Sequence, residues 1–165
     1  MKRNSKGFTL IELLIVVAII GIIVAIAIPN LLNAIQRAKQ RRTMGDQRSI
    51  ATAIESYGVD FNRYPAAAGY TWPTTLGTYP GVTVSGKLAG YVSPTYIRVC
   101  PLSDGWSSWF LVTVDSNGQN YALISAGKDG LATTQPSPFG ATTDFNADIV
   151  FSNGQFVNFP EGVQN

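Results

Sequence analysis

A single acidic residue, Glu12, stands at the entrance of a long apolar segment, where its charge demands a chemical explanation. From Leu13 to Ile28 every residue is apolar or glycine. A carboxylate at the centre of a bilayer costs about 2.5–3.5 kcal/mol even on insertion-based scales, so an acid inside such a segment requires a named partner. We therefore expect Glu12 to be neutralised by a cation.

A second set of oxygen-bearing side chains lies near the C-terminal end, at Asp144, Asn146 and Asp148. Their alternate spacing is typical of the start of a calcium loop. The segment is not an EF-hand, because Ile149 stands where that loop needs glycine and Gln155 where it needs a bidentate glutamate. Aspartate and asparagine are also ordinary turn formers. The segment therefore predicts either a calcium site or a network of capped turns.

The sequence contains no histidine. This excludes Ser-His-Asp and Cys-His nucleophiles and histidine-based zinc sites. No phosphate-binding P-loop or dinucleotide fingerprint is present either. The one cysteine, Cys100, excludes an intramolecular disulfide, and we expect it at a buried apolar position. We therefore predict no enzymatic activity. The enzymatic alternative is a hydrolytic pair of acids in the loop between Asp129 and Asp148.

Charge gives little support for nucleic-acid binding. The formal net charge is +2, but three of the twelve basic residues lie within the first seven positions, leaving nine against ten acids beyond them. A basic stretch between residues 37 and 48 lacks interleaved aromatic residues that could stack on bases. We expect a solvated helix face beside phospholipid headgroups. The alternative is a site for an acidic partner such as DNA.

One long helix is predicted from Phe8 to about Gly58, where glycine is a credible stop. Its first part is apolar enough to cross a membrane if the residues before Leu13 are included. Pro29 lies inside it and predicts a kink or a locally melted turn. The alternatives are a helix that ends at Pro29, a plain membrane anchor, or a secretory signal peptide cleaved near Ala27.

The second half of this helix is amphipathic, because its apolar residues recur at helical spacing and face a core. The stripe comprises Ile50, Ala53, Ile54 and Tyr57. Two hairpins follow, with strands expected at 109–114, 121–125, 149–151 and 155–157 around Asn-Gly turns. Between helix and strands, the segment 66–94 is rich in proline and glycine and predicts only short elements, around 74–76 and 81–84. Three or four antiparallel strands packed on the helix make an α+β roll.

The segment Gly7–Phe8–Thr9–Leu10–Ile11–Glu12, with a basic leader before it and an apolar run ending near Pro29, resembles the type IV pilin superfamily. This superfamily includes type IV pilins and the pseudopilins of type II secretion. The resemblance implies cleavage after Gly7 by a prepilin peptidase and N-methylation of Phe8. It further implies that Glu12 pairs with the Phe8 amine of a neighbouring subunit, in a filament whose helices are often unwound near the position of Pro29.

Two further segments are similar to major pseudopilins of type II secretion. One is Asn62–Arg63–Tyr64–Pro65, and the other is Ser125–Ala126–Gly127–Lys128–Asp129–Gly130 followed by Ala147–Asp148–Ile149. In that family, Ca²⁺ binds between the segments that correspond to 125–130 and 147–149. The resemblance implies Asp129 and Asp148 as ligands, with Ser125 and Asp144 as further candidates. The intervening loop is longer here than is usual in the family and contains Pro136 and Pro138.

The expected protein is therefore a type IV pilin-like roll, and most like the major pseudopilin of a type II secretion system, helping to push protein cargo across the outer membrane. Its expected parts are a leader at 1–7, a transmembrane and filament-core helix at 8–29, an amphipathic continuation at 30–60, a loop at 61–95, and an antiparallel sheet at 96–165 with an acidic loop at 125–149.

The expected setting is the bacterial inner membrane, crossed once, with the C-terminal domain in the periplasm and the filament in the periplasm or reaching the cell surface. Expected partners are further copies in a helical filament, a prepilin peptidase, an inner-membrane assembly platform and minor pseudopilins, but not nucleic acid. The alternatives are a major or minor subunit of a surface type IV pilus, for adhesion, motility or DNA uptake, or a membrane-tethered binding module.

Overall fold

The computed structural model describes residues 7–65, 82–83, 88–115, 117–132 and 140–162. The chain divides into two compact units, residues 1–35 and residues 36–165. The boundary between the units falls inside the long helix α1 (Leu10–Phe61). The second unit also contains a short helix and all the strands of the described residues. The expected α+β class is confirmed. Residues 1–6 of the expected leader (1–7) lie outside the described residues, as does the short element expected around 74–76. The short element expected around 81–84 is present as β1 (Val82–Thr83).

Helix α1 is shifted toward the C-terminus relative to the predicted Phe8–Gly58. It runs three residues past Gly58, which remains helical. Its last turn is held by Tyr57 and Phe61, whose rings stack with centroids 4.3 Å apart. The stop comes instead at Asn62, which takes a left-handed conformation with φ of 53°. Asparagine tolerates this conformation better than other non-glycine residues, so it serves as the C-terminal cap.

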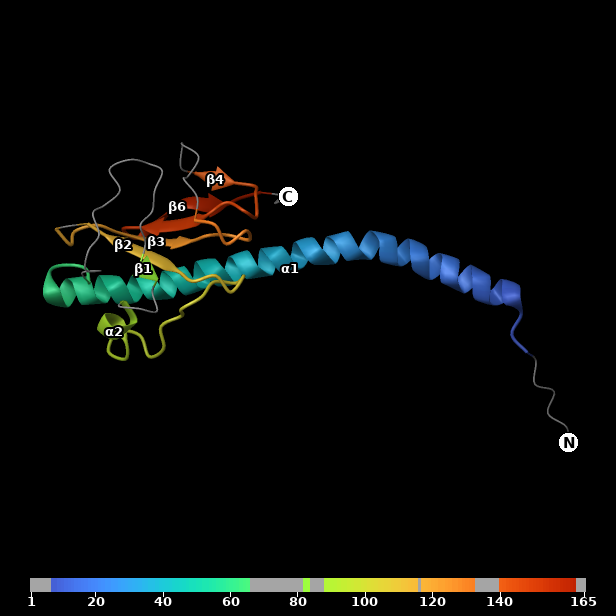
Figure 1. Cartoon of the computed structure of the whole chain (residues 1–165), viewed down its shortest axis with the longest axis horizontal. Helices are drawn as coiled ribbons and strands as arrows, with labels where there is room; N and C mark the ends of the chain where they lie inside the picture. The colour runs from blue at the N-terminus through green and yellow to red at the C-terminus, as the bar shows by residue number, and fades with distance from the viewer. Residues whose placement is uncertain (1–6, 66–81, 84–87, 116, 133–139, 163–165) are drawn as a thin grey trace, which may run out of the picture. The chain divides into compact units, whose positions relative to one another are not determined.

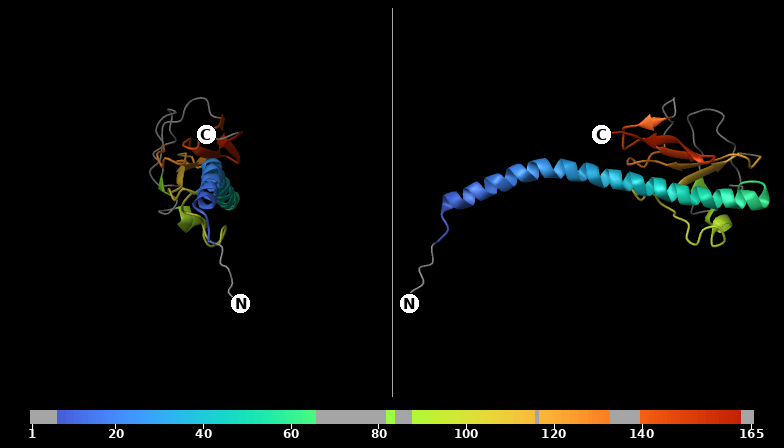
Figure 2. Two further views of the ribbon diagram at one scale, coloured as in Figure 1. Left: turned by 90° about the vertical axis from the view of Figure 1, so that its right-hand side faces the viewer. Right: turned by 180° about the vertical axis from the view of Figure 1, so that it is seen from behind.

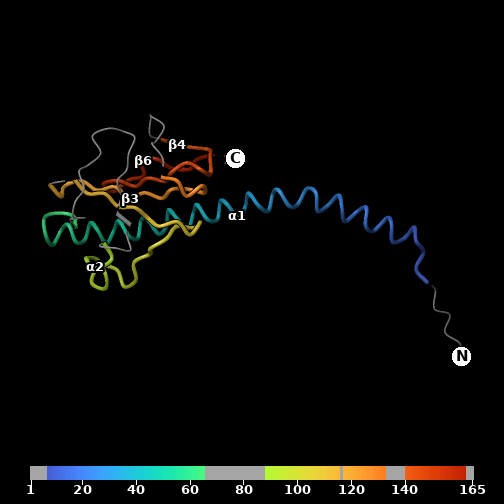
Figure 3. Tube along the Cα trace, in the orientation of Figure 1, coloured from blue at the N-terminus to red at the C-terminus, as the bar shows by residue number. Residues whose placement is uncertain are grey.

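Pro29 does not interrupt α1, which remains helical from Leu10 to Phe61 (Figure 3). The expectation of a locally melted turn is therefore wrong for the isolated chain, as is the alternative that the helix ends at Pro29. Proline removes one backbone hydrogen bond, while its fixed φ near −65° is compatible with a helix. The flanking turns retain their own hydrogen bonds and keep the segment helical.

The strands of the described residues form one six-stranded sheet in the order β1-β2-β3-β5-β6-β4. Figure 1 shows this sheet lying along the second half of α1. The two predicted hairpins are β2–β3 and β5–β6, and β3 has the predicted bounds. The strands are β1 (Val82–Thr83), β2 (Leu111–Val114), β3 (Tyr121–Ser125), β4 (Ala141–Thr142), β5 (Ile149–Ser152) and β6 (Gln155–Pro160).

The expectation of a purely antiparallel sheet confined to residues 96–165 is wrong at both edges. Strand β1 comes from the loop before it and pairs with β2, and β4 pairs with β6 in parallel. Both additions are two residues long. They extend a sheet edge through tertiary contact, and a two-residue strand carries no readable alternation of apolar and polar residues.

The second half of α1 packs on the sheet, as the apolar stripe predicts. Ile50, Ala53 and Ile54 are buried against residues of β2 and β3, while Tyr57 is half-buried. The sheet lies along one side of this part of α1 and the short helix α2 (Leu88–Val92) along another (Figure 2). Helix α2 was not foreseen.

Hydrogen bonds from two side chains fix the position of α1 against the rest of the second unit. The buried Gln47 side chain donates through Nε2 to the carbonyl oxygens of Leu123 (3.3 Å) and Ile149 (2.8 Å). It thereby ties α1 to β3 and β5 together. Cys100 is buried in the same core, as expected. Trp106 donates from Nε1 to Gln36 Oε1 at 2.7 Å, which fixes the segment before β2 to α1.

Candidate assembly segment and acidic loop

The first turn of α1 is closed by a reciprocal pair of side chains, Thr9 and Glu12. The Thr9 backbone N–H and hydroxyl donate to Glu12 Oε2 at 2.8 and 2.7 Å, and the Glu12 N–H donates to Thr9 Oγ1 at 3.3 Å. This is a capping box, which satisfies backbone donors that a helix start otherwise leaves open. Glu12 is thus held, within its own chain, at the end of the helix. The sequence pattern T-x-x-E was a readable signal for the role of Thr9, and sequence reasoning missed it.

This cap still leaves Glu12 able to take a cation. An ionised carboxylate offers about four lone-pair positions on two oxygens, and the bonds from Thr9 both end on Oε2. The helix N-terminus also carries a partial positive charge that favours an acid there. A further ammonium group can therefore join the carboxylate without breaking the cap.

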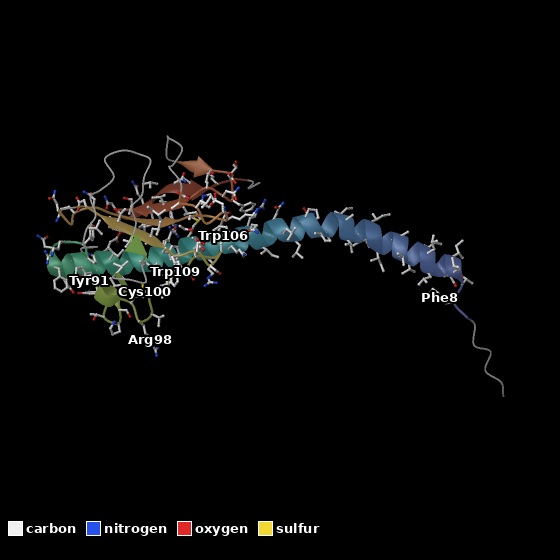
Figure 4. All side chains as sticks on the ribbon, viewed as in Figure 1. Phe8, Tyr91, Arg98, Cys100, Trp106 and Trp109 are labelled. Carbon is white, nitrogen blue, oxygen red and sulfur yellow. The ribbon has the colours of Figure 1, made fainter. Side chains whose placement is uncertain are left out.

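Gly7 and Phe8 precede the helix and are both exposed. Apart from its chain neighbours, no described residue has an atom within 4 Å of the position that a Cβ on Gly7 would take. Phe8 is 73% exposed and lies at the very start of the described chain (Figure 4). An exposed, uncrowded backbone here is what a peptidase needs for access, although cleavage after Gly7 and methylation of Phe8 stay predictions.

The rest of the first unit presents an apolar surface that is exposed in the part of the chain that the structure describes. Large apolar side chains from Leu10 to Ile35 are between 43% and 80% exposed. By length and composition α1 is able to cross a membrane, with a mean hydropathy of 3.2 over its most apolar 18 residues, none of them buried. Such a surface is stable in water only when lipid or other helices cover it.

The segments on either side of the acidic loop contact each other through their backbones. The Lys128 N–H donates to the Phe145 carbonyl at 2.9 Å. Gly127 has φ of 62°, and a Cβ on it would lie 2.8 Å from the carbonyl oxygens of Asn146 and Ala147. Only glycine allows this approach. The close contact brings two backbone carbonyls next to the 125–130 segment.

The four candidate ligands are differently placed. Ser125 is buried and donates from Oγ to Asp104 Oδ2 at 2.6 Å. Asp148 is buried, with both carboxylate oxygens shielded from solvent. Asp129 and Asp144 are exposed, and each accepts a hydrogen bond from the backbone two residues later, at 3.0 and 2.9 Å. These last contacts are capped turns of the kind the sequence also predicted.

The donor set therefore fits a metal only in part. Within the described ranges, no group of three or more histidine, cysteine, aspartate or glutamate residues could hold an ion. A calcium ion here would need backbone carbonyls and water to complete six to eight oxygens. Calcium binding stays a prediction.

Asp104 is a structural acid that sequence reasoning missed. Besides the Ser125 hydroxyl, it accepts from the backbone N–H groups of Trp106 (2.9 Å) and Ser108 (3.0 Å) through Oδ1. It is 2% exposed. The dipeptide Asp104–Gly105 was the available signal, since it marks a turn. Its capping bonds order the loop between α2 and β2 against the acidic loop.

The basic stretch of α1 is mostly a solvated face, as expected. Arg41, Arg42 and Arg48 are exposed. Arg42 pairs with Asp46 at 3.5 Å, and the Arg48 guanidinium lies 5.2 Å from the centre of the Phe156 ring. Such exposed pairs contribute little to stability. Arg37 is an exception, because its Nε is buried.

Comparison with known families divides the chain at the end of the apolar segment. Residues 2–28 match the family model for the prokaryotic N-terminal methylation motif. Residues 30–143 match the model for type II secretion system protein G. The two matches together cover the helix, the loop after it and most of the sheet.

Individual proteins show the same similarity. The chain is 30% identical over 135 residues to the type II secretion system core protein G of Klebsiella michiganensis, covering 81% of this chain and 92% of that protein. It is 29% identical over 132 residues to the protein of the same name from Pectobacterium carotovorum, covering 80% and 81%. It is also 36% identical over 113 residues to the type IV wide pilus major component PilA4 of Thermus thermophilus, covering 68% and 85%. No solved structure matches the chain.

Proposed function

The chain belongs to the family of type II secretion system protein G, and we propose that it is the major pseudopilin of such a system. In this role it is a structural subunit of a pilin-like filament that helps to move protein cargo across the outer membrane. The proposal rests on a contrast in burial among the described residues. The large apolar side chains of the first half of α1 are exposed, whereas those of the second half are buried in the core of the second unit.

The proposed assembly mechanism begins in the inner membrane. The apolar part of α1 anchors the subunit there, and the C-terminal domain lies in the periplasm. A prepilin peptidase removes residues 1–7 and leaves a cationic amine on Phe8, which is then methylated. An inner-membrane platform and minor pseudopilins extract the subunit into the filament.

Two charges drive the ordering of subunits in this proposal. Glu12 of one subunit meets the Phe8 amine of its neighbour, and the pairing removes both charges from an apolar setting. A charge-assisted contact of this kind is short and strong when water is excluded. The Thr9 cap keeps the Glu12 carboxylate on the helix end until the amine arrives. Apolar side chains along the helix then pack against neighbouring helices.

Mass spectrometry of the native protein tests the processing step. We expect a chain that starts at Phe8 and carries one additional methyl group. A leader still attached, or a chain trimmed beyond Ala27, would contradict the proposal. The second result would support a secretory signal peptide.

Substitution of Glu12 tests the charge pairing in cells that contain the assembly machinery. Glu12→Ala should reduce filament yield at least tenfold while leaving the thermal unfolding of the domain unchanged. The matched control is Asp46→Asn, which removes an acid from the same helix outside the apolar segment and should assemble normally. Equal filament yield from Glu12→Ala and the wild type would indicate a membrane-tethered module rather than a subunit.

A second candidate function is the main or minor subunit of a surface type IV pilus. The similarity to the wide pilus component of Thermus thermophilus favours it. The two functions separate on deletion of the gene. Loss of secreted enzymes with unchanged surface pili supports the secretion role, and loss of surface pili with normal secretion supports the pilus role.

We also propose a structural calcium ion at the acidic loop, with Asp148 and Asp129 as ligands. Support comes from the buried Asp148 carboxylate and from the two carbonyls that face Gly127. Millimolar Ca²⁺ should raise the unfolding temperature of the wild type and have little effect on Asp148→Asn. The control Asp46→Asn should respond like the wild type. An unchanged unfolding temperature in the wild type would discard the site.

A further inference from the structure

A groove of about 190 Å³ lies on the second unit, between the start of its part of α1 and the C-terminal end of β6. Arg37 and Arg41 line one wall from successive turns of the helix, together with Met44. Pro160 and Gly162 line the other. None of the functions discussed above accounts for this groove.

The two arginines are suited to holding an anion. Residues four apart lie on the same helix face, so the two guanidinium groups project on the same side. Arg37 is half-buried, and its buried Nε donates to no acceptor among the described residues. A buried donor without an acceptor costs free energy that a bound anion would recover. Arg42, one position further, is already paired with Asp46 and lies outside the groove lining.

The position of Arg37 in the sequence indicates which anion is present. It is the first charged residue after Glu12, with 24 uncharged residues between them. The exposed apolar residues Leu31, Leu32 and Ile35 lead directly up to it. In the membrane-anchored subunit, the charge-free stretch occupies the hydrocarbon, and the first cation beyond it falls at the level of the lipid headgroups.

We propose that this groove binds the phosphate of a phospholipid headgroup in the outer leaflet of the inner membrane. The planar, forked guanidinium matches phosphate oxygens bidentately. Met44 on one wall and Pro160 on the other provide apolar surface for the glycerol side of the headgroup. Lys39 and the exposed Arg42 add cationic charge on the same stretch of helix, and such juxtamembrane basic segments are attracted to anionic lipids. The groove thus holds the stored subunit at a fixed depth, and the lipid leaves when the subunit is extracted. This inference rests on the membrane-stored state of the proposed function.

The test measures lipid retention by native mass spectrometry of the full mature chain in a neutral detergent, titrated with phosphatidylglycerol. The double variant Arg37→Gln/Arg41→Gln should weaken lipid binding at least tenfold. The matched control Arg63→Gln/Arg98→Gln removes two exposed arginines elsewhere, including Arg98, which points away from α1 in Figure 4, and should stay within twofold of the wild type. An equal loss in both variants, or in neither, would overturn the proposal.

Two further arms distinguish other anions. Inorganic phosphate should compete only at concentrations far above those of the lipid. If it binds as tightly as the lipid, the groove is a site for a free anion and the lipid assignment is wrong. If the groove variant retains the lipid but loses filament yield, the groove contacts an acidic residue of a neighbouring subunit, which also overturns it. Filament yield of the wild type is scored separately, so failure of assembly does not obscure the lipid result.

Discussion

The two halves of α1 have similar helical geometry but opposite surroundings. In the first half, Ile20 is 53% exposed and Ile23 is 60% exposed. In the second half, Ile50 and Ile54 are 0% exposed beneath the sheet. Isoleucine side chains are therefore exposed in the first half of the helix and buried in the second. The second half completes its structure within one chain, whereas the first requires lipid or other copies.

Polar groups in the two halves differ in the same way. In the first half, the Glu12 carboxylate accepts hydrogen bonds from Thr9, which lies only three residues earlier in the chain. The buried polar groups of the second half reach across the fold, as Gln47 does to β3 and β5. A contact between residues close in the chain does not depend on the tertiary structure, so it is kept when the helix moves from the membrane into a filament. Contacts between distant residues instead hold the second unit in one fold. A filament subunit needs both properties in one helix.

The largest expected difference comes from truncating an isoleucine in each half. Ile54→Ala should lower the free energy of unfolding by about 2–5 kcal/mol, because it removes buried methyl groups and leaves a cavity. Ile20→Ala should change it by less than about 0.5 kcal/mol, since that side chain is 53% exposed among the described residues. Urea unfolding of the full chain in detergent, followed by tryptophan fluorescence, measures both. Similar losses for the two variants would show that the halves are not independent.

Polar side chains provide the next comparison. Gln47→Leu should cost about 1–3 kcal/mol, because the carbonyls of Leu123 and Ile149 lose their side-chain donor in a buried setting. Asn33→Leu, at an exposed position of the first half, is the control and should leave unfolding unchanged. The same urea titration applies. A neutral Gln47→Leu would mean that packing alone sets the register of the helix.

A titration at high pH should affect only the second unit. The Tyr96 hydroxyl donates to Asp60 Oδ2 at 2.6 Å, and this hydrogen bond, with burial, raises the Tyr96 pKa from 10.0 to about 12. Because the folded pKa lies above the unfolded one, the stabilisation is complete below pH 10 and is lost as the pH rises through about 12. Tyr96→Phe should remove this loss. An identical pH profile for the variant between pH 10 and 12 would show that another group is responsible.

The smallest effect concerns the reactivity of Cys100. Burial raises the pKa of its thiol from 9.0 to about 11, so little thiolate is present at pH 8. We expect alkylation by iodoacetamide at pH 8 to be at least tenfold slower in the folded chain than in urea, followed by mass spectrometry. A folded chain that reacts at the urea rate would place Cys100 outside the core.

Much of the fold was predictable because its signals are local. The Asn-Gly turns gave both hairpins, with Asn153 and Gly154 taking the positive φ values that such a turn requires. The apolar stripe of α1 gave its buried face. Helix α2 and the edge strand β4 were not predictable, since five and two residues are too few for a periodic pattern. A short element was expected around 81–84, where β1 lies, but its pairing with β2 was not predicted. The residues of the candidate sites were also predictable only in part. Glu12 was found from its unusual setting, while the caps made by Thr9 and Asp104 were missed.

By itself the sequence determined that this chain carries an apolar, acid-capped segment and a separate folding domain, because periodicity and charge-free length are properties of neighbouring residues. The tertiary structure decided which polar groups meet. It brought Asp104 to Ser125 across 21 positions, set two carbonyls against Gly127, and formed the Arg37–Arg41 groove with the end of the chain. Such contacts depend on how distant segments pack, and no local pattern encodes their distances.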